Sequence, residues 1–290
     1  MSVDIIQLLV GGILLGGIYG LAAFGLSISF GVLNILNLAH GEFLMLGSLV
    51  SYSAFVLLGI NPFVSAVLVI PLFVVFGVGF YLLLLKPVSD KPPHQLLVAS
   101  ILVTLGISLA IEDLTAFFWE RPVTGIAYSL PAIELGHVVI SSLRLSILLF
   151  ICVLAVLLQA YLKRTFVGRA IRAITQSREG AKIVGVPIAH ISGFTFGLGV
   201  ALAASAGVFY VTLFTVTPVI GIPLTVKYLC VVVLGGLGSL VGSVVGGLIL
   251  GLSEVLTAYY FGAEWSPCIA FVLLISILII RPSGLFGIEG

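Results

Sequence analysis

Long apolar runs, separated by short polar or glycine-rich stretches, occupy most of the 290 residues. Runs near 20 residues are long enough to cross about 30 Å of hydrocarbon as helices. The strands of a membrane barrel would instead alternate apolar and polar residues over about ten positions. The pattern therefore predicts helices, about eight in number with an uncertainty of one, at approximately 5–30, 42–60, 62–85, 96–119, 142–162, 190–216, 224–258 and 263–280.

Two stretches interrupt this pattern. Residues 31–42 join two apolar runs but are polar, and residues 235–239 read Gly-Gly-Leu-Gly-Ser inside a run that is too long for one crossing. We expect a broken or re-entrant helix near each of them. The predicted fold is thus an all-α integral membrane protein, in which residues 1–290 form a single transmembrane domain.

Composition supports lipid as the solvent of this chain. Hydrophobic residues make up 61% and charged residues only 8%, against about 25% charged residues in a soluble domain. In lipid every backbone polar group must be paired internally, which leaves helices and closed barrels as the only spanning structures. The formal net charge of +1 gives no general attraction to nucleic acid.

The positive charges are concentrated in one loop. Half of the twelve Lys and Arg residues lie there, opposed only by Glu179: Lys163, Arg164, Arg169, Arg172, Arg178 and Lys182. Lys86 and Lys91 lie two spans earlier, on the same side. Since Lys and Arg favour the cytoplasmic side, we expect a cytoplasmic loop at about 163–189 and an extracytoplasmic N-terminus. Arg281 favours a cytoplasmic C-terminus.

Apolar residues recur among the charges of this loop, at positions 171, 174, 181, 183 and 184. The pattern predicts a short amphipathic helix parallel to the membrane, with Gly185 and Pro187 at its end. One interpretation is a basic segment held near anionic lipid. The other is a docking helix for a cytoplasmic partner, which would transmit a push into the spans.

Glycine is abundant, with 34 residues, and part of it is periodic. Gly12, Gly16 and Gly20 are four residues apart, as are Gly238, Gly242 and Gly246 further along the chain. This spacing places small residues on one helix face, where two backbones approach closely. Either these faces serve close packing alone, or the helices carrying them line a path or move against each other.

Catalytic chemistry finds little support in the sequence. The chain has no Walker A pattern, no nucleophile elbow and no zinc signature. It therefore lacks the loop that would cradle a nucleotide phosphate. The three cysteines are far apart and do not have metal-ligand or disulfide spacing. We predict a non-enzymatic chain with no metal and no cofactor of its own.

The polar residues inside the apolar pattern are the candidates for a solute path. Unpaired polar groups in hydrocarbon cost several kcal/mol, so intramembrane polar residues are functional candidates. The alternative for the first stretch is an ordinary interfacial turn. Glu254 is either a packing partner or a pore residue, and Lys227 is expected to extend to the interface. The tentative path residues are Asn34, Asn37, His40, Glu42, Gly235, Gly236, Gly238 and Ser239.

Four short segments resemble a known family. Residues 179–185 (Glu-Gly-Ala, then Gly185) resemble the Glu-Ala-Ala-xxx-Gly core of the EAA motif of ABC-importer permeases, with Gly in place of the middle Ala and without an evident hydrophobic-Pro tail. Residues 37–43, 234–242 and 281–287 resemble the Asn-Leu-Ala-His-Gly, Gly-Gly-xx-Gly-Ser and Arg-Pro-xx-Gly-Leu-Phe-Gly segments of LivH-type branched-chain amino acid permeases. Their order and spacing agree across almost the whole chain.

The resemblance implies a permease subunit of a bacterial ABC importer in the inner membrane, most simply for branched-chain amino acids. It implies two cytoplasmic ATPase subunits that bind the ATP, a second related permease in a heterodimer, and an external solute-binding protein. Movement would follow an alternating-access mechanism. The expected contacts with the ATPase are Arg169, Arg172, Arg178, Glu179, Ala181 and Gly185.

Two alternatives stay open. Closely similar permeases are associated with urea and short amides, so the solute is not fixed by the resemblance. A stand-alone secondary transporter or channel belongs to a different class, and would need its own coupling or selectivity residues in mid-membrane. The charged candidates for that role are few and lie mostly near the expected boundaries.

Overall fold

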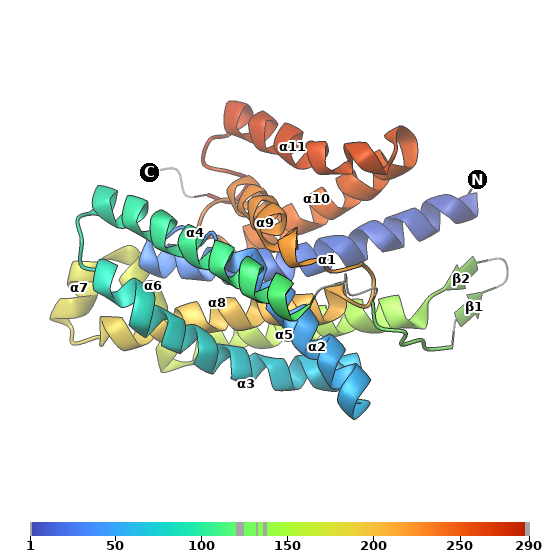
Figure 1. Ribbon diagram of the computed structural model, residues 1–290. Coiled ribbons are helices and arrows are strands. Elements are labelled where there is room, and N and C mark those ends of the chain that lie inside the picture. Colours follow the sequence, from blue (N-terminus) through green and yellow to red (C-terminus); the bar gives the residue numbers. More distant parts are fainter. Residues whose placement is uncertain (1, 120–124, 132, 136–137, 288–290) are drawn as a thin grey trace.

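The computed structural model describes residues 2–119, 125–131, 133–135 and 138–287 and is almost entirely helical (Figure 1). Within these residues nine helical segments are long and apolar enough to cross a membrane. The all-α membrane fold is confirmed, with one segment more than the eight expected. The helices are α1 (Ser2–Leu33), α2 (His40–Leu58), α3 (Pro62–Phe80), α4 (Pro93–Phe118), α5 (Ser142–Arg164), α6 (Phe166–Gln176), α7 (Arg178–Ile183), α8 (Ile188–Tyr210), α9 (Gly221–Gly235), α10 (Leu240–Phe261) and α11 (Ser266–Ile280).

The extra segment comes from the long run at 224–258, which forms two helices. α9 and α10 pack against each other as an antiparallel hairpin, in which Gly235 lies against Gly242 and Gly246 lies against Val231. The turn between them, residues 236–239, is the interruption that the glycines predict. Gly236 and Gly238 there have φ angles of +103° and +79°, which L side chains rarely adopt.

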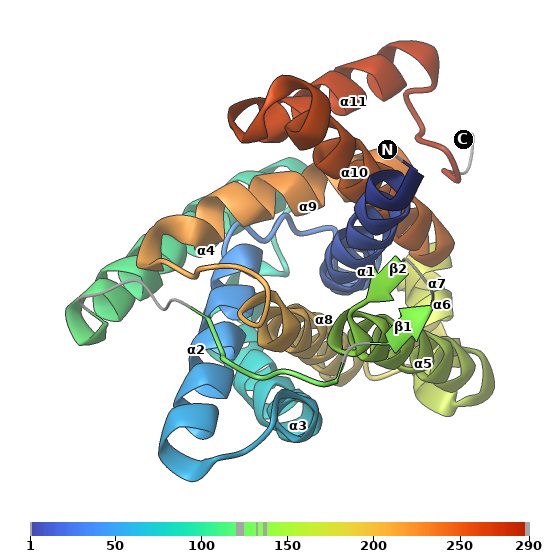
Figure 2. The same ribbon diagram turned by 90° about the vertical axis from the view of Figure 1, so that its right-hand side faces the viewer.

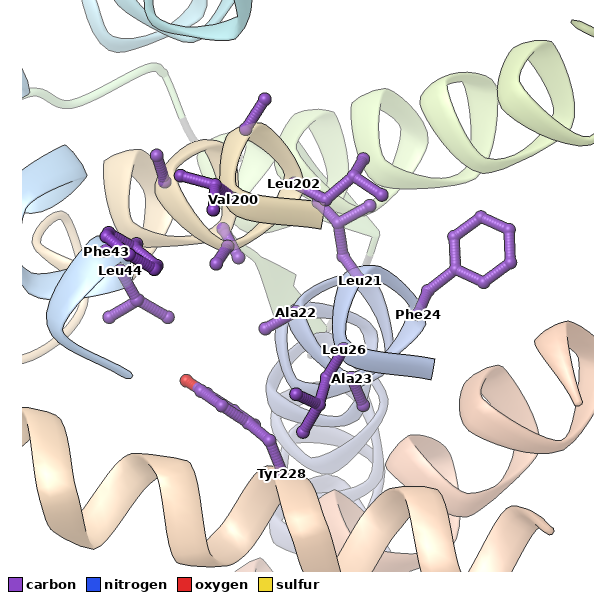
Figure 3. Packing of buried hydrophobic residues seen from close by; sticks show 14 of the residues in the cluster. Leu21, Ala22, Ala23, Phe24, Leu26, Phe43, Leu44, Val200, Leu202 and Tyr228 are labelled. Carbon is purple, nitrogen blue, oxygen red and sulfur yellow. The ribbon is translucent and has the colours of Figure 1, made fainter. Parts of the chain in front are cut away.

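α8 is the central helix, and nearly all of its residues are buried. α1, α2 and α3 surround it, while α11 lies at the periphery with its apolar side chains exposed (Figure 2). Exposed apolar surface of this kind suits a lipid environment. Figure 3 shows the interior, where Leu21 and Ala22 of α1, Phe43 of α2 and Val200 of α8 converge.

The predicted glycine stripes are places of close helix contact. A Cβ on Gly16 would lie 2.7 Å from Leu248 Cα, and one on Gly12 would lie 2.9 Å from Leu252 Cα. α1 and α10 therefore pack antiparallel with their backbones almost touching, as the four-residue spacing predicts. The same principle brings Gly25 of α1 against Gly199 of α8.

The two ends of the molecule differ in their elements. At one end (left in Figure 1) lie α6, α7 and the turn between α3 and α4, which runs through the π-helical Tyr81–Leu85 and the 3₁₀ turn Lys86–Val88. The end of the described chain lies on the same side, where Leu285 and Phe286 pair with Leu234 and Gly235. At the other end lie the start of α1 and a short antiparallel ribbon of β1 (Ile133–Leu135) and β2 (Val138–Ile140), paired with Ile133 opposite Ile140. We call these the basic end and the opposite end.

Candidate functional site

The first helix break, residues 34–39, lies between α1 and α2 and is held by hydroxyl groups of distant helices. Thr104 of α4 accepts a hydrogen bond from the Leu38 N–H at 3.1 Å. Thr225 of α9 accepts one from the Gly41 N–H at 2.7 Å, and its hydroxyl lies 3.0 Å from the Leu38 carbonyl oxygen. These contacts satisfy backbone groups that a break in a membrane helix would otherwise leave unpaired.

The four polar residues predicted around this break lie in different surroundings. Asn34 is exposed with a φ of +53°, in a cavity at the basic end that it shares with Lys91 and Arg178. Asn37 is buried, and its Oδ1 accepts a hydrogen bond from the Ala39 N–H, which makes it a turn residue. His40 is also buried, with its Nε2 2.9 Å from the Ala22 carbonyl oxygen.

Glu42 is the most unusual residue of this group, because it is a fully buried carboxyl in the first turn of α2. Its Oε1 accepts a hydrogen bond from Ser108 Oγ of α4 at 2.8 Å, while Oε2 has no hydrogen-bond partner among the described residues. Gly221 at the start of α9 leaves the space that the carboxyl group occupies. A side chain at that position would collide with it.

The second break, residues 236–239, lies elsewhere. Gly238 is next to Gly31 near the end of α1, and Thr175 of α6 is also against Gly31. Ser239 accepts a hydrogen bond from the Gly242 N–H with its side chain and thereby caps α10. The whole length of α9, about 20 Å at 1.5 Å per residue, separates Gly235 from the Glu42 carboxyl at Gly221. The structure therefore keeps the second group of predicted path residues away from Glu42, whereas Asn34, three residues after Gly31, lies at the same end as Gly238.

A charged cluster that the sequence did not predict lies between α1, α9 and α10. Lys227 Nζ is 2.8 Å from Glu254 Oε1 and donates to the Tyr19 hydroxyl at 3.2 Å. Tyr19 in turn donates to Glu254 Oε2 at 2.9 Å. The expectation that Lys227 extends to the interface is wrong, because its ammonium group points to a carboxylate inside the protein. Glu254 is its packing partner, one of the two roles expected for it.

This cluster borders a cavity of about 460 Å³. The cavity lies between the first half of α1, the start of α5 and the ends of α8 and α10, towards the opposite end of the molecule. Its volume is within the range of about 300–1,000 Å³ typical of small-molecule sites. Among the described residues that line it, three carry charge: Lys227, Glu254 and Arg144.

Tyr228 of α9 connects this cluster with the first break. Its ring centroid is 6.0 Å from that of Tyr19 and 6.1 Å from that of His40. Figure 3 shows its side chain extending from α9 into the space between α1 and α2. Its buried hydroxyl has no partner among the described residues. Aromatic and polar groups thus run from the Lys227–Glu254 pair to the start of α2.

The predicted basic loop forms two short helices rather than one. Thr165 accepts a hydrogen bond from the Gly168 N–H and caps α6, and Ser177 caps α7 in the same way through the Gly180 N–H. Ala170, Ile171 and Ile174 are buried, so α6 is amphipathic as predicted and lies against the bundle. Its other face is exposed.

The residues expected to contact an ATPase divide between these two surroundings. Arg169 and Glu179 are exposed, as is Gly185, which has a φ of +79° at the end of α7. Ala181 is buried, so it packs inside instead of facing a partner. Arg178 is half-buried in the cavity with Asn34. Arg172 is exposed but donates to the Leu162 carbonyl oxygen at 2.6 Å, which fastens α6 to the end of α5.

Two features of this region were missed by the sequence analysis. Ile183 is 85% exposed and Val184 75% exposed, directly after the charged turn of α7. Phe166 at the start of α6 is 60% exposed. Exposed apolar side chains of this kind mark a contact with another protein or with the membrane.

Comparison with known proteins gives a consistent result. Residues 8–278 match the family model described as branched-chain amino acid transport system / permease component. The permease protein LivH of a high-affinity branched-chain amino acid transport system from Escherichia coli (strain K12) is 29% identical, over 97% of this chain and 95% of that protein. BraD of Pseudomonas aeruginosa, described in the same words, is 30% identical over the same shares. No solved structure gives a significant match.

Proposed function

The chain belongs to the family of branched-chain amino acid transport permease components, and from that premise we propose that it is the membrane-spanning permease subunit of a bacterial ABC importer for branched-chain amino acids. The observation that carries the proposal is the match over residues 8–278, which includes the helix breaks and the α6–α7 segment. The absence of a Walker A pattern fits a subunit whose ATP is bound by other chains.

In this proposal the complex contains two cytoplasmic ATPase subunits, a second related permease and an external solute-binding protein. α6 and α7 contact an ATPase through Arg169, Glu179 and the exposed pair Ile183 and Val184. Lys and Arg are concentrated at the basic end, which supports placing that end in the cytoplasm of a bacterial cell. The α3–α4 turn and the C-terminus are then cytoplasmic as well. The N-terminus is then extracytoplasmic.

The mechanism that we propose is alternating access. ATP-driven closure of the ATPases moves α6, which is joined to α5 through the hydrogen bond from Arg172 to the Leu162 carbonyl group and through the close packing of Gly168 in α6 against the Leu162 backbone. α6 also touches Gly31 near the end of α1 through Thr175. A shift of α6 is therefore transmitted to two spanning helices, and α1 carries the first helix break at its end.

The decisive test is transport in proteoliposomes. We expect leucine uptake that requires ATP, both ATPase subunits, the companion permease and the binding protein. Uptake by this chain alone, driven by an ion gradient, would contradict the permease-subunit proposal and favour a secondary transporter or channel. ATP-driven uptake of urea or acetamide in place of leucine would retain the ABC importer and change its solute.

The coupling contact has its own test. Reversing charge in Arg169→Glu should weaken binding of the ATPase pair, because the side chain is exposed on the outer face of α6. Lys86→Glu, an exposed residue at the same end but outside α6, α7 and the Asn34 cavity, is the matched control. If binding of the ATPases measured by co-purification is equal in the two variants, Arg169 does not belong to the docking surface.

A further inference from the structure

The contribution of the Lys227–Glu254 ion pair to the stability of the fold is expected to be small. Removing two charges from water costs several kcal/mol per ion, and a hydrophobic pair of similar volume is often as stable or more stable. The pair nevertheless joins α9 to α10 inside a membrane-spanning bundle. Ionisable residues at such depth are candidates for function. The question is what these two charges serve.

The cavity beside them offers a binding role. Glu254 is 2% exposed, while the side chain of Lys227 is 20% exposed, so the ammonium group is the accessible member of the pair. An ammonium group has three donors; Lys227 donates one to the Tyr19 hydroxyl and forms an ion pair with Glu254 Oε1. One donor remains for a group in the cavity.

The charges around the cavity do not balance. Lys227 and Arg144 are positive and Glu254 is negative, which leaves an excess of one positive charge among the described lining residues. The Arg144 guanidinium group lies over Gly11 of α1, 4.0 Å from the position a Cβ there would take. A carboxylate near Lys227 would neutralise the excess, whereas Glu254 is already occupied by Lys227 at Oε1 and by Tyr19 at Oε2.

The rest of the lining is largely apolar. Leu14 and Leu15 of α1, Leu213 and Phe214 after α8, and Val255 of α10 surround the space next to the charges. A molecule with a carboxylate at one end and a branched aliphatic group at the other would place its carboxylate at Lys227 and its aliphatic group on the apolar wall. A neutral amide would use neither the ion pair nor the apolar walls.

We propose that this cavity between α1, α8, α9 and α10 is a binding site for an aliphatic amino acid, with its carboxylate on Lys227 and its side chain on the apolar wall. The identification of the ligand rests on the proposed function. The site itself rests on the cavity and its charges. The site lies towards the opposite end of the molecule, the side from which an importer receives its solute.

Protection of a cysteine in the cavity tests this site without ATP hydrolysis. Ala258→Cys places a thiol in the lining, in a chain whose exposed Cys152 and Cys268 are replaced by Ser. The complex in proteoliposomes is treated with a membrane-impermeant maleimide and L-leucine up to about 10 mM, enough to detect a Kd of about 1 mM. Leu213→Cys serves as a second reporter on another wall, and Leu58→Cys near the α2–α3 turn is the control outside the cavity.

We expect leucine to slow labelling of both cavity cysteines and to leave Leu58→Cys unchanged. 4-Methylpentanoate, which keeps the carboxylate, should protect about as well as leucine, whereas isoamylamine, which lacks the carboxylate, should protect about tenfold more weakly or worse, as the loss of one charged hydrogen-bonding group implies. The double variant Lys227→Met/Glu254→Gln removes both charges together, leaves the net charge unchanged and should keep the thermal unfolding midpoint while losing protection. Lys91→Met is the control for the loss of a lysine side chain outside the cavity.

The outcomes separate the two proposals. Equal protection by leucine in the double variant, or equal protection by isoamylamine or urea, would overturn the carboxylate site. ATP-driven leucine uptake without any protection in the parent chain would overturn the site and leave the proposed function standing. Protection without ATP-driven uptake would support the site and contradict the importer.

Discussion

The two helix breaks look alike in the sequence but are built differently. The first, residues 34–39, lies against α4 and α9, and side-chain hydroxyl groups of Thr104 and Thr225 satisfy its backbone. The second, residues 236–239, is a tight glycine turn at the basic end whose flanking backbone pairs with the C-terminal segment, since Leu285 and Phe286 donate to the carbonyl oxygens of Leu234 and Gly235. Buried polar side chains characterise the first break, whereas the second depends on the backbone conformations of its glycines.

The difference indicates separate tasks. A break that holds a buried carboxyl group next to α4 and α9 is suited to respond to a solute or to a shift of those helices. A glycine turn that contacts α6 and the end of α1 is suited to connect the spans with the basic end. Four substitutions test this contrast, in order of decreasing expected effect.

Gly221→Ala should have the largest effect, because its Cβ would occupy the position of the Glu42 carboxyl group. Overpacking at a buried site costs about 1–3 kcal/mol, and displacing a buried carboxyl adds to it. We expect a loss of about 3 kcal/mol in the free energy of unfolding, measured by denaturant titration in detergent. Gly106→Ala in α4 has open space around it and is the control.

The double variant Gly221→Ala/Glu42→Ala sharpens the test. Removing the carboxyl group should recover part of the loss, with an interaction energy of about 0.5–3 kcal/mol between the two substitutions. If the two effects add without interaction, the contact between Gly221 and Glu42 is not the cause.

Gly236→Ala examines the second break. The substitution meets both a φ of +103° and the backbone of Gly287, which a Cβ would approach to 2.5 Å. Gly262 has a φ of +102° with open space, so Gly262→Ala isolates the backbone strain of about 1–2 kcal/mol. We expect Gly236→Ala to lose about 1 kcal/mol more than this control. Shortening the chain after residue 283 should abolish the excess; an excess that persists would exclude the C-terminal segment as its source.

Thr225→Val keeps the shape of the side chain but removes the hydroxyl group from the first break. The Gly41 N–H would lose its partner and the Leu38 carbonyl group a neighbour, at a cost of about 1–3 kcal/mol. Thr195→Val in α8 is the control, because its buried hydroxyl bonds to the Ile191 carbonyl group of its own helix. Thermal unfolding in detergent should rank Thr225→Val clearly below Thr195→Val. Equal midpoints would show that α9 does not hold the break.

Asn34→Gly should have the smallest effect. Asn34 adopts a φ of +53° at the exposed end of α1, and Gly adopts this conformation without strain. We expect a change within about 0.5 kcal/mol. Asn34→Val should instead cost about 1–2 kcal/mol, because a β-branched residue is disfavoured at positive φ. A large loss in Asn34→Gly would assign the Asn side chain a role that its exposed position does not indicate.

Several parts of the fold could be predicted because they depend on local or periodic properties. Apolar runs set the spans, since hydrocarbon thickness fixes the length of a crossing helix. The polar stretch at 34–42 marked the first break and the glycines at 235–239 marked the second. Glycine and asparagine residues weaken a helix in any surroundings. The four-residue spacing of Gly12, Gly16 and Gly20 marked the face of closest contact with α10.

What the sequence could not provide was the pairing of distant residues. Lys227 and Glu254 are on different helices, and only the α9–α10 hairpin places their charges 2.8 Å apart. Thr225 supports a break that lies far before it in the chain, and a lone Thr in an apolar run carries no sign of this. The sequence itself determined a helical membrane protein with two broken segments and one strongly basic loop. Tertiary packing alone decided which polar groups meet, because a contact between helices depends on their relative rotation and depth, which no local pattern records.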